Sequence, residues 1–99
     1  MAVKPLDLHP EALEEWKSAL AWYLERNETA ALNFVAEIDR AIELVIASPR
    51  RWPTGDRGTR KFVLQRFPFA VIYREKEDVV QVLAIAHGHR KPGYWKGRL

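Results

Sequence analysis

The segment that decides the fold is residues 60–87, which reads RKFVLQRFPFAVIYREKEDVVQVLAIAH. It is rich in Val, Ile, Phe and Tyr, and its apolar residues recur with a period of two, as is typical of β-strands. This pattern predicts three strands, at Arg60–Gln65, Phe69–Arg74 and Val79–His87. The breaks at Arg66–Pro68 and Glu75–Asp78 are short enough for hairpin turns, so we expect an antiparallel meander.

The third of these strands is apolar on both faces. One face carries Val80, Val82, Ala84 and Ala86, and these alternate with Leu83 and Ile85. A strand that is apolar on both sides is typically buried inside a sheet. We therefore place residues 79–87 at the centre of the sheet and expect helices to cover one side of it.

Two amphipathic helices are predicted before the meander, at residues 10–26 and 28–47. Pro10 suits the first turn of a helix, and Asn27 can cap the start of the second. The apolar stripes expected to form the core are Leu13, Trp16, Leu20, Tyr23 and Leu24 in the first helix, and Ala31, Phe34, Val35, Ile38, Ala41, Ile42 and Val45 in the second. Because so few residues separate the stripes, an antiparallel helical hairpin is expected. Glu37, on the opposite face of the second helix, is expected to be solvated.

Proline and glycine mark the segments outside the helices. Pro5 restricts any strand at Val3–Leu8 to an edge of the sheet, because proline cannot donate a backbone hydrogen bond. The composition of Ser48–Gly58 indicates a loop. The sequence therefore predicts an α+β fold in a single domain, residues 1–99, with an N-terminal edge strand, a helical hairpin, a three-stranded antiparallel meander and a basic C-terminal tail.

Charge is divided unevenly between the two halves of the chain. Residues 1–49 carry four basic and nine acidic side chains, whereas residues 50–99 carry twelve and four, so the formal charges are −5 and +8. The last thirteen residues hold four Lys or Arg, two His and the aromatic pair Tyr94 and Trp95, with no acidic residue. Such a segment is suited to binding an anionic partner. A solvated tail with one aromatic packed on the body remains an alternative.

The residue types that are missing exclude several classes of protein. The sequence contains no cysteine, so a disulfide framework and thiolate metal ligands are excluded. No segment approaches the roughly 20 apolar residues that span a bilayer, and residues 1–8 lack the pattern of a signal peptide. We expect a cytoplasmic protein that needs no metal and no cofactor.

Several short motifs follow one another along nearly the whole chain. They are Ala21-Trp22-Tyr23, residues 34–39 (FVAEID), residues 66–74 (RFPFAVIYR), Ala84-Ile85-Ala86-His87 and residues 90–95 (RKPGYW). In this order they resemble the RelE/ParE superfamily of toxins from bacterial type II toxin–antitoxin, or plasmid stabilisation, modules. The Trp-Tyr pair and the Pro-Gly-Tyr-Trp ending are more similar to the ParE branch.

The resemblance implies a toxin that a cognate antitoxin neutralises by wrapping an extended or helical segment over the sheet and the hairpin, forming a hetero-oligomer. ParE-like members poison DNA gyrase, whereas RelE-like members cut messenger RNA on the ribosome. If this chain were such an endoribonuclease, the resemblance would place Lys61, Arg90 and Tyr94 in its catalytic set. Ribonuclease members usually carry an arginine in the third strand, where this chain has Ala70. The missing cation favours the ParE-like branch.

Basic and aromatic side chains of the positive half are the expected partner-binding residues. They are Arg60, His87, His89, Arg90, Lys91, Tyr94, Trp95 and Arg98. Under the endoribonuclease hypothesis, His87 or His89 could also move protons near neutral pH. A third hypothesis, a non-toxic basic nucleic-acid-binding module, is supported by net charge alone. The chain is thus expected to be an enzyme only if it belongs with the RelE-like nucleases.

Overall fold

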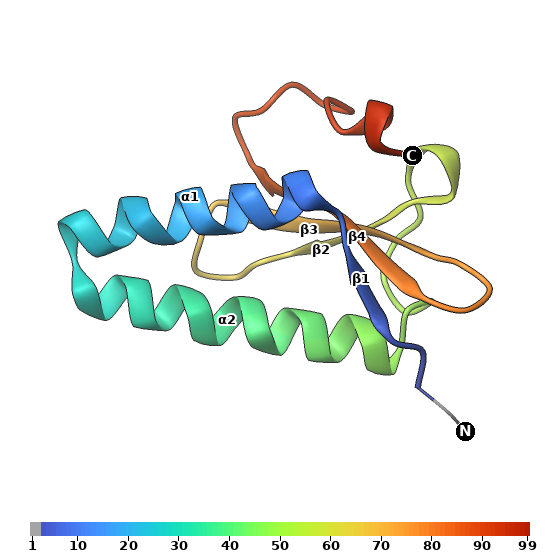
Figure 1. Ribbon diagram of the computed structural model, residues 1–99, viewed down its shortest axis with the longest axis horizontal. Coiled ribbons are helices and arrows are strands. Elements are labelled where there is room, and N and C mark those ends of the chain that lie inside the picture. The colour runs from blue at the N-terminus through green and yellow to red at the C-terminus, as the bar shows by residue number, and fades with distance from the viewer. Residues whose placement is uncertain (1–2) are drawn as a thin grey trace.

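The computed structural model describes residues 3–99. The elements are β1 (Leu6–Leu8), α1 (Pro10–Arg26), α2 (Glu28–Ala47), β2 (Arg60–Val63), β3 (Phe69–Glu75) and β4 (Val80–His87), with short 3₁₀ turns at Asp56–Gly58 and Lys96–Arg98. The four strands form one sheet in the order β1-β4-β3-β2, and the two helices run antiparallel beside each other (Figure 1). The expected α+β architecture is confirmed. No helix in residues 3–99 is long and apolar enough to cross a membrane.

The sheet contains the predicted meander, with β2, β3 and β4 paired antiparallel and β4 in the interior. The N-terminal strand is an edge strand, as expected, but it is parallel to β4 and only three residues long. Its pairing is bounded by two backbone hydrogen bonds, from the Val80 amide to the Pro5 carbonyl at 3.0 Å and from the His9 amide to the Val82 carbonyl at 2.9 Å. Beyond Val82, the same edge of β4 is therefore not covered by β1.

The helices begin and end at residues suited to those positions. The His9 side chain accepts a hydrogen bond from the Glu11 amide, and Pro10 occupies the first turn of α1, where a missing N–H costs nothing. Asn27 is extended and serves both helices. Its amide donates to the Tyr23 carbonyl at 2.7 Å, and its side chain accepts from the Ala30 amide at 3.1 Å. This one residue therefore reverses the chain between α1 and α2.

The main core lies between the helices and one face of the sheet. Phe34 and Ile38 of α2 are fully buried against this face, which includes Tyr73 of β3. The predicted stripe of α2 is buried at every position except Val35, which is half-buried, but that of α1 is partly wrong, because Leu13 and Leu24 are exposed by 36% and 53%. The buried face of α1 instead runs through small residues such as Ala12 and Ala19, which allow close packing.

The second face of the sheet is covered by the C-terminal segment. In Figure 1 this segment, in red, lies above the sheet, whereas α2 lies below it. Trp95 is only 8% exposed and packs with Ala70, Ile72 and Leu83 in a separate apolar cluster. Gly93 has a positive φ of 75°, which a residue with a side chain rarely adopts. The tail is therefore a folded cap on the sheet.

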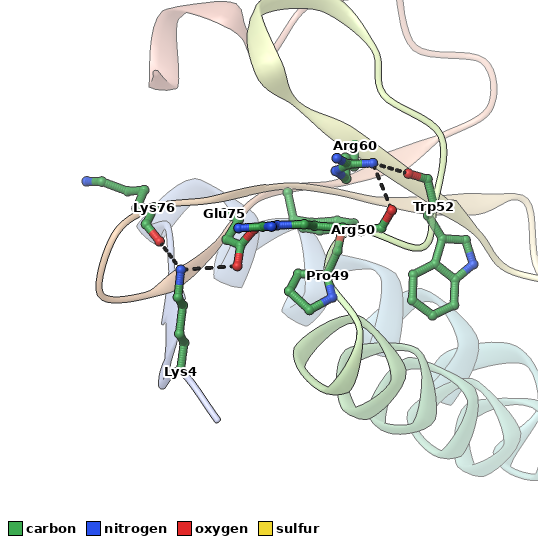
Figure 2. Close-up of polar contacts among 8 residues, drawn as sticks. Lys4, Pro49, Arg50, Trp52, Arg60, Glu75 and Lys76 are labelled. Atoms are coloured by element: carbon green, nitrogen blue, oxygen red, sulfur yellow. Dashed lines mark hydrogen bonds and ion pairs between the residues drawn. The ribbon is translucent and has the colours of Figure 1, made fainter. Parts of the chain in front are cut away.

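Polar contacts attach the loop after α2 to the end of the sheet (Figure 2). Arg60 donates from Nη1 to the carbonyls of Arg50 and Trp52 at 3.1 and 2.8 Å. The Glu75 carboxylate pairs with Arg50 at 2.8 Å and with Lys4 at 3.1 Å. These contacts place the N-terminal segment, the loop and β3 in fixed positions at the end of the molecule away from the helix hairpin turn.

Candidate functional site

Two grooves meet where β3 begins and where β4 ends and continues into the tail. The large groove has a volume of about 490 Å³ and lies between α1 and the ends of these strands. The small groove has a volume of about 290 Å³ and lies on the face of the sheet that the tail covers. Both are lined by His87, Arg90 and Tyr94, which we call the junction. A ligand at the junction can therefore extend into either groove.

The small groove has an apolar floor and a basic rim. Its floor includes Ala70 and Ile72 of β3, while Lys61, Arg90 and Lys91 supply its charged lining residues. Lys61 pairs with Ile72 across β2 and β3, so it projects from the same face of the sheet as the floor. All three residues predicted for a nuclease, Lys61, Arg90 and Tyr94, line this groove. The arrangement produces a positive potential suited to phosphate or carboxylate groups.

The large groove is mainly aromatic. Trp22 and Tyr23 of α1 form one wall, and Phe69 of β3 contributes to the other. Trp22 is 52% exposed and lies under the Arg26 guanidinium, which is 4.0 Å from the ring centroid. Glu14 lies on the helical rim and Arg90 on the opposite one. This groove can thus accept an apolar side chain between rims of opposite charge.

Glu15 of α1 binds the tail to the sheet. Its Oε1 accepts from the Ile85 amide at 3.0 Å and from Arg98 Nη1 at 2.9 Å. Its Oε2 accepts from the Tyr94 hydroxyl at 2.6 Å and from Arg98 Nη2 at 3.0 Å. The Glu15 side chain is 16% exposed and that of Arg98 is 10% exposed. A bidentate ion pair at this degree of burial fixes the orientation of Arg98 relative to Glu15.

The Glu15–Arg98 pair also completes the uncovered edge of β4. Arg98 Nη1 donates to the Leu83 carbonyl at 2.9 Å, and Glu15 accepts from the Ile85 amide. These two backbone groups lie just beyond the part of β4 that β1 covers. Because buried backbone groups need partners, the ion pair takes the place of a neighbouring strand.

The environment shifts the pKa values of Glu15 and Tyr94. Burial raises the pKa of Glu15, but hydrogen bonds from Arg98, Tyr94 and the Ile85 amide outweigh it, so the pKa falls below its ordinary value of 4.5. Burial, the hydrogen bond to Glu15 and the charge of Glu15 together raise the pKa of Tyr94 well above its ordinary value. Glu15 is therefore ionised and Tyr94 is a neutral hydrogen-bond donor at physiological pH.

His87 lies at the end of β4, against Phe69, with ring centroids 5.0 Å apart in an edge-on arrangement. Its Nδ1 accepts a hydrogen bond from the His89 amide at 3.0 Å. The neutral ring must then carry its proton on Nε2. His87 thus presents one N–H donor, and the exposed His89 ring lies beside it at 5.1 Å.

The sequence-family model for the ParE toxin of the type II toxin–antitoxin system parDE matches residues 6–92 of this chain. The chain belongs to this family. It is therefore the toxin component of a type II toxin–antitoxin system, and membership in the family implies an antitoxin partner. The resemblance to the RelE/ParE superfamily, and to its ParE branch, is confirmed.

Solved structures share the fold of this ParE-family toxin. The chromosomal ParDE toxin–antitoxin system from P. aeruginosa matches with a TM-score of 0.68 at 23% identity, over 86% of this chain and 96% of that chain. The isolated RelE toxin from E. coli matches with a TM-score of 0.61 at 20% identity, over 96% and 95%. A doubly substituted arginine-to-alanine RelE from E. coli matches with 0.61 at 19%, over 89% and 86%. No curated protein sequence matches the chain.

The structure divides the residues that the sequence predicts for partner binding. His89, Arg90 and Lys91 are exposed at or beside the junction. Trp95 is buried and the Arg98 side chain is 10% exposed, and both attach the tail to the rest of the protein. The other three predicted residues, Arg60, His87 and Tyr94, are half-buried. Arg60 points away from Lys61 toward the loop after α2, because successive side chains in a strand face opposite sides (Figure 2).

Two carboxylates of the toxin were missed by sequence reasoning. Glu15 lies between Ala12 and Ala19 on the buried face of α1, and this helical spacing is the signal that could have found it. Glu37 was expected to be solvated, but its side chain is only 14% exposed. It accepts from the amides of Gln65 and Arg66 and pairs with the Arg66 guanidinium. Within residues 3–99, no group of three or more His, Asp or Glu side chains is placed to hold a metal ion.

Proposed function

We propose that this ParE-family toxin acts in the cytoplasm and inhibits DNA gyrase, which it binds through the exposed basic side chains around the junction. The observation that carries the proposal is the small groove, where Ala70 forms part of the floor beneath Lys61 and Arg90. This groove can bind an anionic surface through its basic rim. Its apolar floor, at Ala70, places no cation beneath a reacting phosphate.

The convergence of Lys61, Arg90 and Tyr94 in one groove makes a RelE-like endoribonuclease the second candidate. Two features count against it. Ala70 stands where the ribonuclease members usually carry an arginine, and losing one such charge typically lowers the rate by a factor of about 10² to 10³. The Tyr94 ring also lies against Arg90 and Arg98, whose guanidinium carbons are 4.0 and 5.1 Å from its centroid. Less of the ring is then available to stack on a base.

A non-toxic nucleic-acid-binding module is supported less well than either toxin activity. Several cations of the positive half are paired with carboxylates, namely Arg50 with Glu75, Arg66 with Glu37 and Lys96 with Asp56. Such pairing lowers the attraction that net charge would otherwise provide toward a phosphate backbone. Lys61, Arg90 and Lys91, which pair with no carboxylate within residues 3–99, line the small groove.

For the antitoxin, we propose a segment that covers the junction and places apolar side chains in the large groove. Trp22, Tyr23 and Phe69 supply the apolar surface for it. Acidic residues of the same segment would lie near Arg90 and Lys91, in the half of the chain that carries a charge of +8. Covering the junction in this way would block the surface proposed for gyrase.

Expression without the antitoxin tests the gyrase proposal. Growth should stop while messenger RNA on ribosomes remains uncut, and the purified toxin should impede supercoiling by gyrase. Arg90→Ala should weaken this inhibition without lowering the melting temperature, because the side chain is exposed. Arg40→Ala, which changes an exposed arginine on α2, is the matched control. Codon-dependent cleavage in the ribosomal A site, with supercoiling unaffected, would instead establish the endoribonuclease.

A further inference from the structure

We propose that Glu15 is a positioning residue for toxin action. Its carboxylate holds the Tyr94 hydroxyl, and the Tyr94 ring in turn holds the Arg90 guanidinium at the junction. The inference rests on the proposed function only in taking Arg90 as part of the target-binding surface. Glu15 lines the large groove, proposed for the antitoxin, but not the small groove with its basic rim, so on target binding it acts through the other two side chains.

Several contacts from the tail converge on the Glu15 carboxylate. Glu15 receives the Tyr94 hydroxyl at 2.6 Å and both Arg98 nitrogens at 2.9 and 3.0 Å. Arg98 also pairs with Glu11 at 3.2 Å, one turn earlier on α1. The segment between these two tail residues contains Trp95, which packs on the sheet. Glu15 therefore fixes the orientation of the tail as well as its attachment.

The Tyr94 ring in turn contacts the Arg90 side chain. The Arg90 guanidinium carbon lies 4.0 Å from the centroid of the Tyr94 ring, within the range of a cation–π contact. In the described part of the chain, no carboxylate lies within ion-pair distance of Arg90. The stacking contact is thus the interaction that restrains this side chain. Movement of the Tyr94 ring would release Arg90 from the boundary between the grooves.

An amide cannot replace the Glu15 carboxylate. Each Glu15 oxygen accepts from one Arg98 nitrogen, so either orientation of a glutamine would turn its NH₂ group toward an arginine donor. The substitution Glu15→Gln keeps the size of the side chain but disrupts its geometry. It should release Tyr94 and Arg90 while the apolar contacts of Trp95 remain.

A matched control variant, Glu37→Gln, distinguishes a positioning role of Glu15 from a purely structural one. Glu37 is also a partly buried helical carboxylate that accepts backbone amides and pairs with an arginine, but it holds the turn between β2 and β3. Glu37→Gln should therefore lower stability in a similar way without moving Arg90. The readouts are the melting temperature, growth arrest, inhibition of supercoiling and amide exchange of residues 88–99.

The two variants are assayed at a temperature at which both are fully folded. Glu15→Gln should then raise the half-inhibitory concentration for supercoiling at least about tenfold, as expected for losing a charge-assisted hydrogen bond. Amide exchange should accelerate in residues 88–99. Glu37→Gln should stay within about threefold of the wild type, because its contacts lie outside the tail. Wild-type inhibition by Glu15→Gln, or an equal loss in both variants, would overturn the proposal.

The same variants and assays also decide two further outcomes. If the wild type arrests growth but leaves supercoiling unchanged, the gyrase target is wrong, and growth arrest by the two variants still decides whether Glu15 positions the site. If Glu15→Gln does not fold, Tyr94→Phe replaces it, because that change removes only the hydroxyl and keeps the Glu15–Arg98 pair. Tyr94→Phe should then reduce toxicity, and unchanged toxicity would overturn the proposal.

Discussion

Truncation of Trp95 tests whether the tail is a structural cap on the sheet. The side chain is 8% exposed and packs on Ala70, Ile72, Leu83 and Ala84. Truncating a buried tryptophan to alanine typically costs about 3 to 5 kcal/mol. We expect Trp95→Ala to cost about 3 kcal/mol, because a chain terminus can partly collapse into the vacated space.

The expected loss can be converted into a melting temperature. The entropy of unfolding is about 2.1 cal/mol/K per residue, or about 0.2 kcal/mol/K for a chain of 99 residues. A loss of about 3 kcal/mol should therefore lower the melting temperature by roughly 15 °C. Thermal and guanidinium unfolding followed by circular dichroism measure it.

Arg90→Ala provides the comparison for this prediction. Arg90 is exposed, so its truncation should change stability by no more than about 0.5 kcal/mol. Both variants should be less toxic, but only Trp95→Ala should also be less stable. A Trp95→Ala variant with wild-type unfolding midpoints would refute the reasoning that the tail stabilises the sheet, and would place Trp95 among the exposed contact residues instead.

Three other predictions follow from the core, the buried carboxylate and the charge distribution. Ile38→Ala should destabilise the protein by about 2 to 5 kcal/mol, because the side chain is fully buried, and an unchanged denaturation midpoint would contradict the packing of α2 on the sheet. The folded-state pKa of Glu15 is lowered, so its stabilisation is complete above its ordinary pKa of 4.5 and is lost as the pH falls through the folded value. The difference in stability between the wild type and Glu15→Gln should accordingly shrink below about pH 4.5 in urea titrations, and a difference that stays constant would argue against an ionised Glu15. Antitoxin affinity should fall as salt rises if exposed charges contribute, and equal dissociation constants at low and high salt in calorimetry would remove this electrostatic contribution.

Local patterns in the sequence were enough to predict most of the fold. The helical periods are produced by burial of one face of each helix, and the runs of Val, Ile, Phe and Tyr in residues 60–87 by burial within the sheet, so both can be recognised without knowing the partner. Asn27 marks the helix reversal for the same local reason, since a cap bonds within its own turn. The bounds of α1 and α2 agree with the prediction to the residue.

The candidate site was predicted in part. Lys61, Arg90 and Tyr94 were named from a family resemblance, and the fold does bring them to one groove. The aromatic groove beside it was not predicted, because its walls come from α1 and β3. Each wall by itself looks like ordinary core sequence.

Only the tertiary structure decided how the tail is used. The residues that hold it are far apart in the chain, because Tyr94 follows Glu15 by 79 positions and Arg98 follows it by 83. Composition marked the tail as basic and aromatic, but not which of its side chains would be buried. The sequence thus determined the elements, whose periodicity is local, whereas the fold determined the contacts of Glu15, because a carboxylate on a helix has no partner until β4 and the tail are brought beside it.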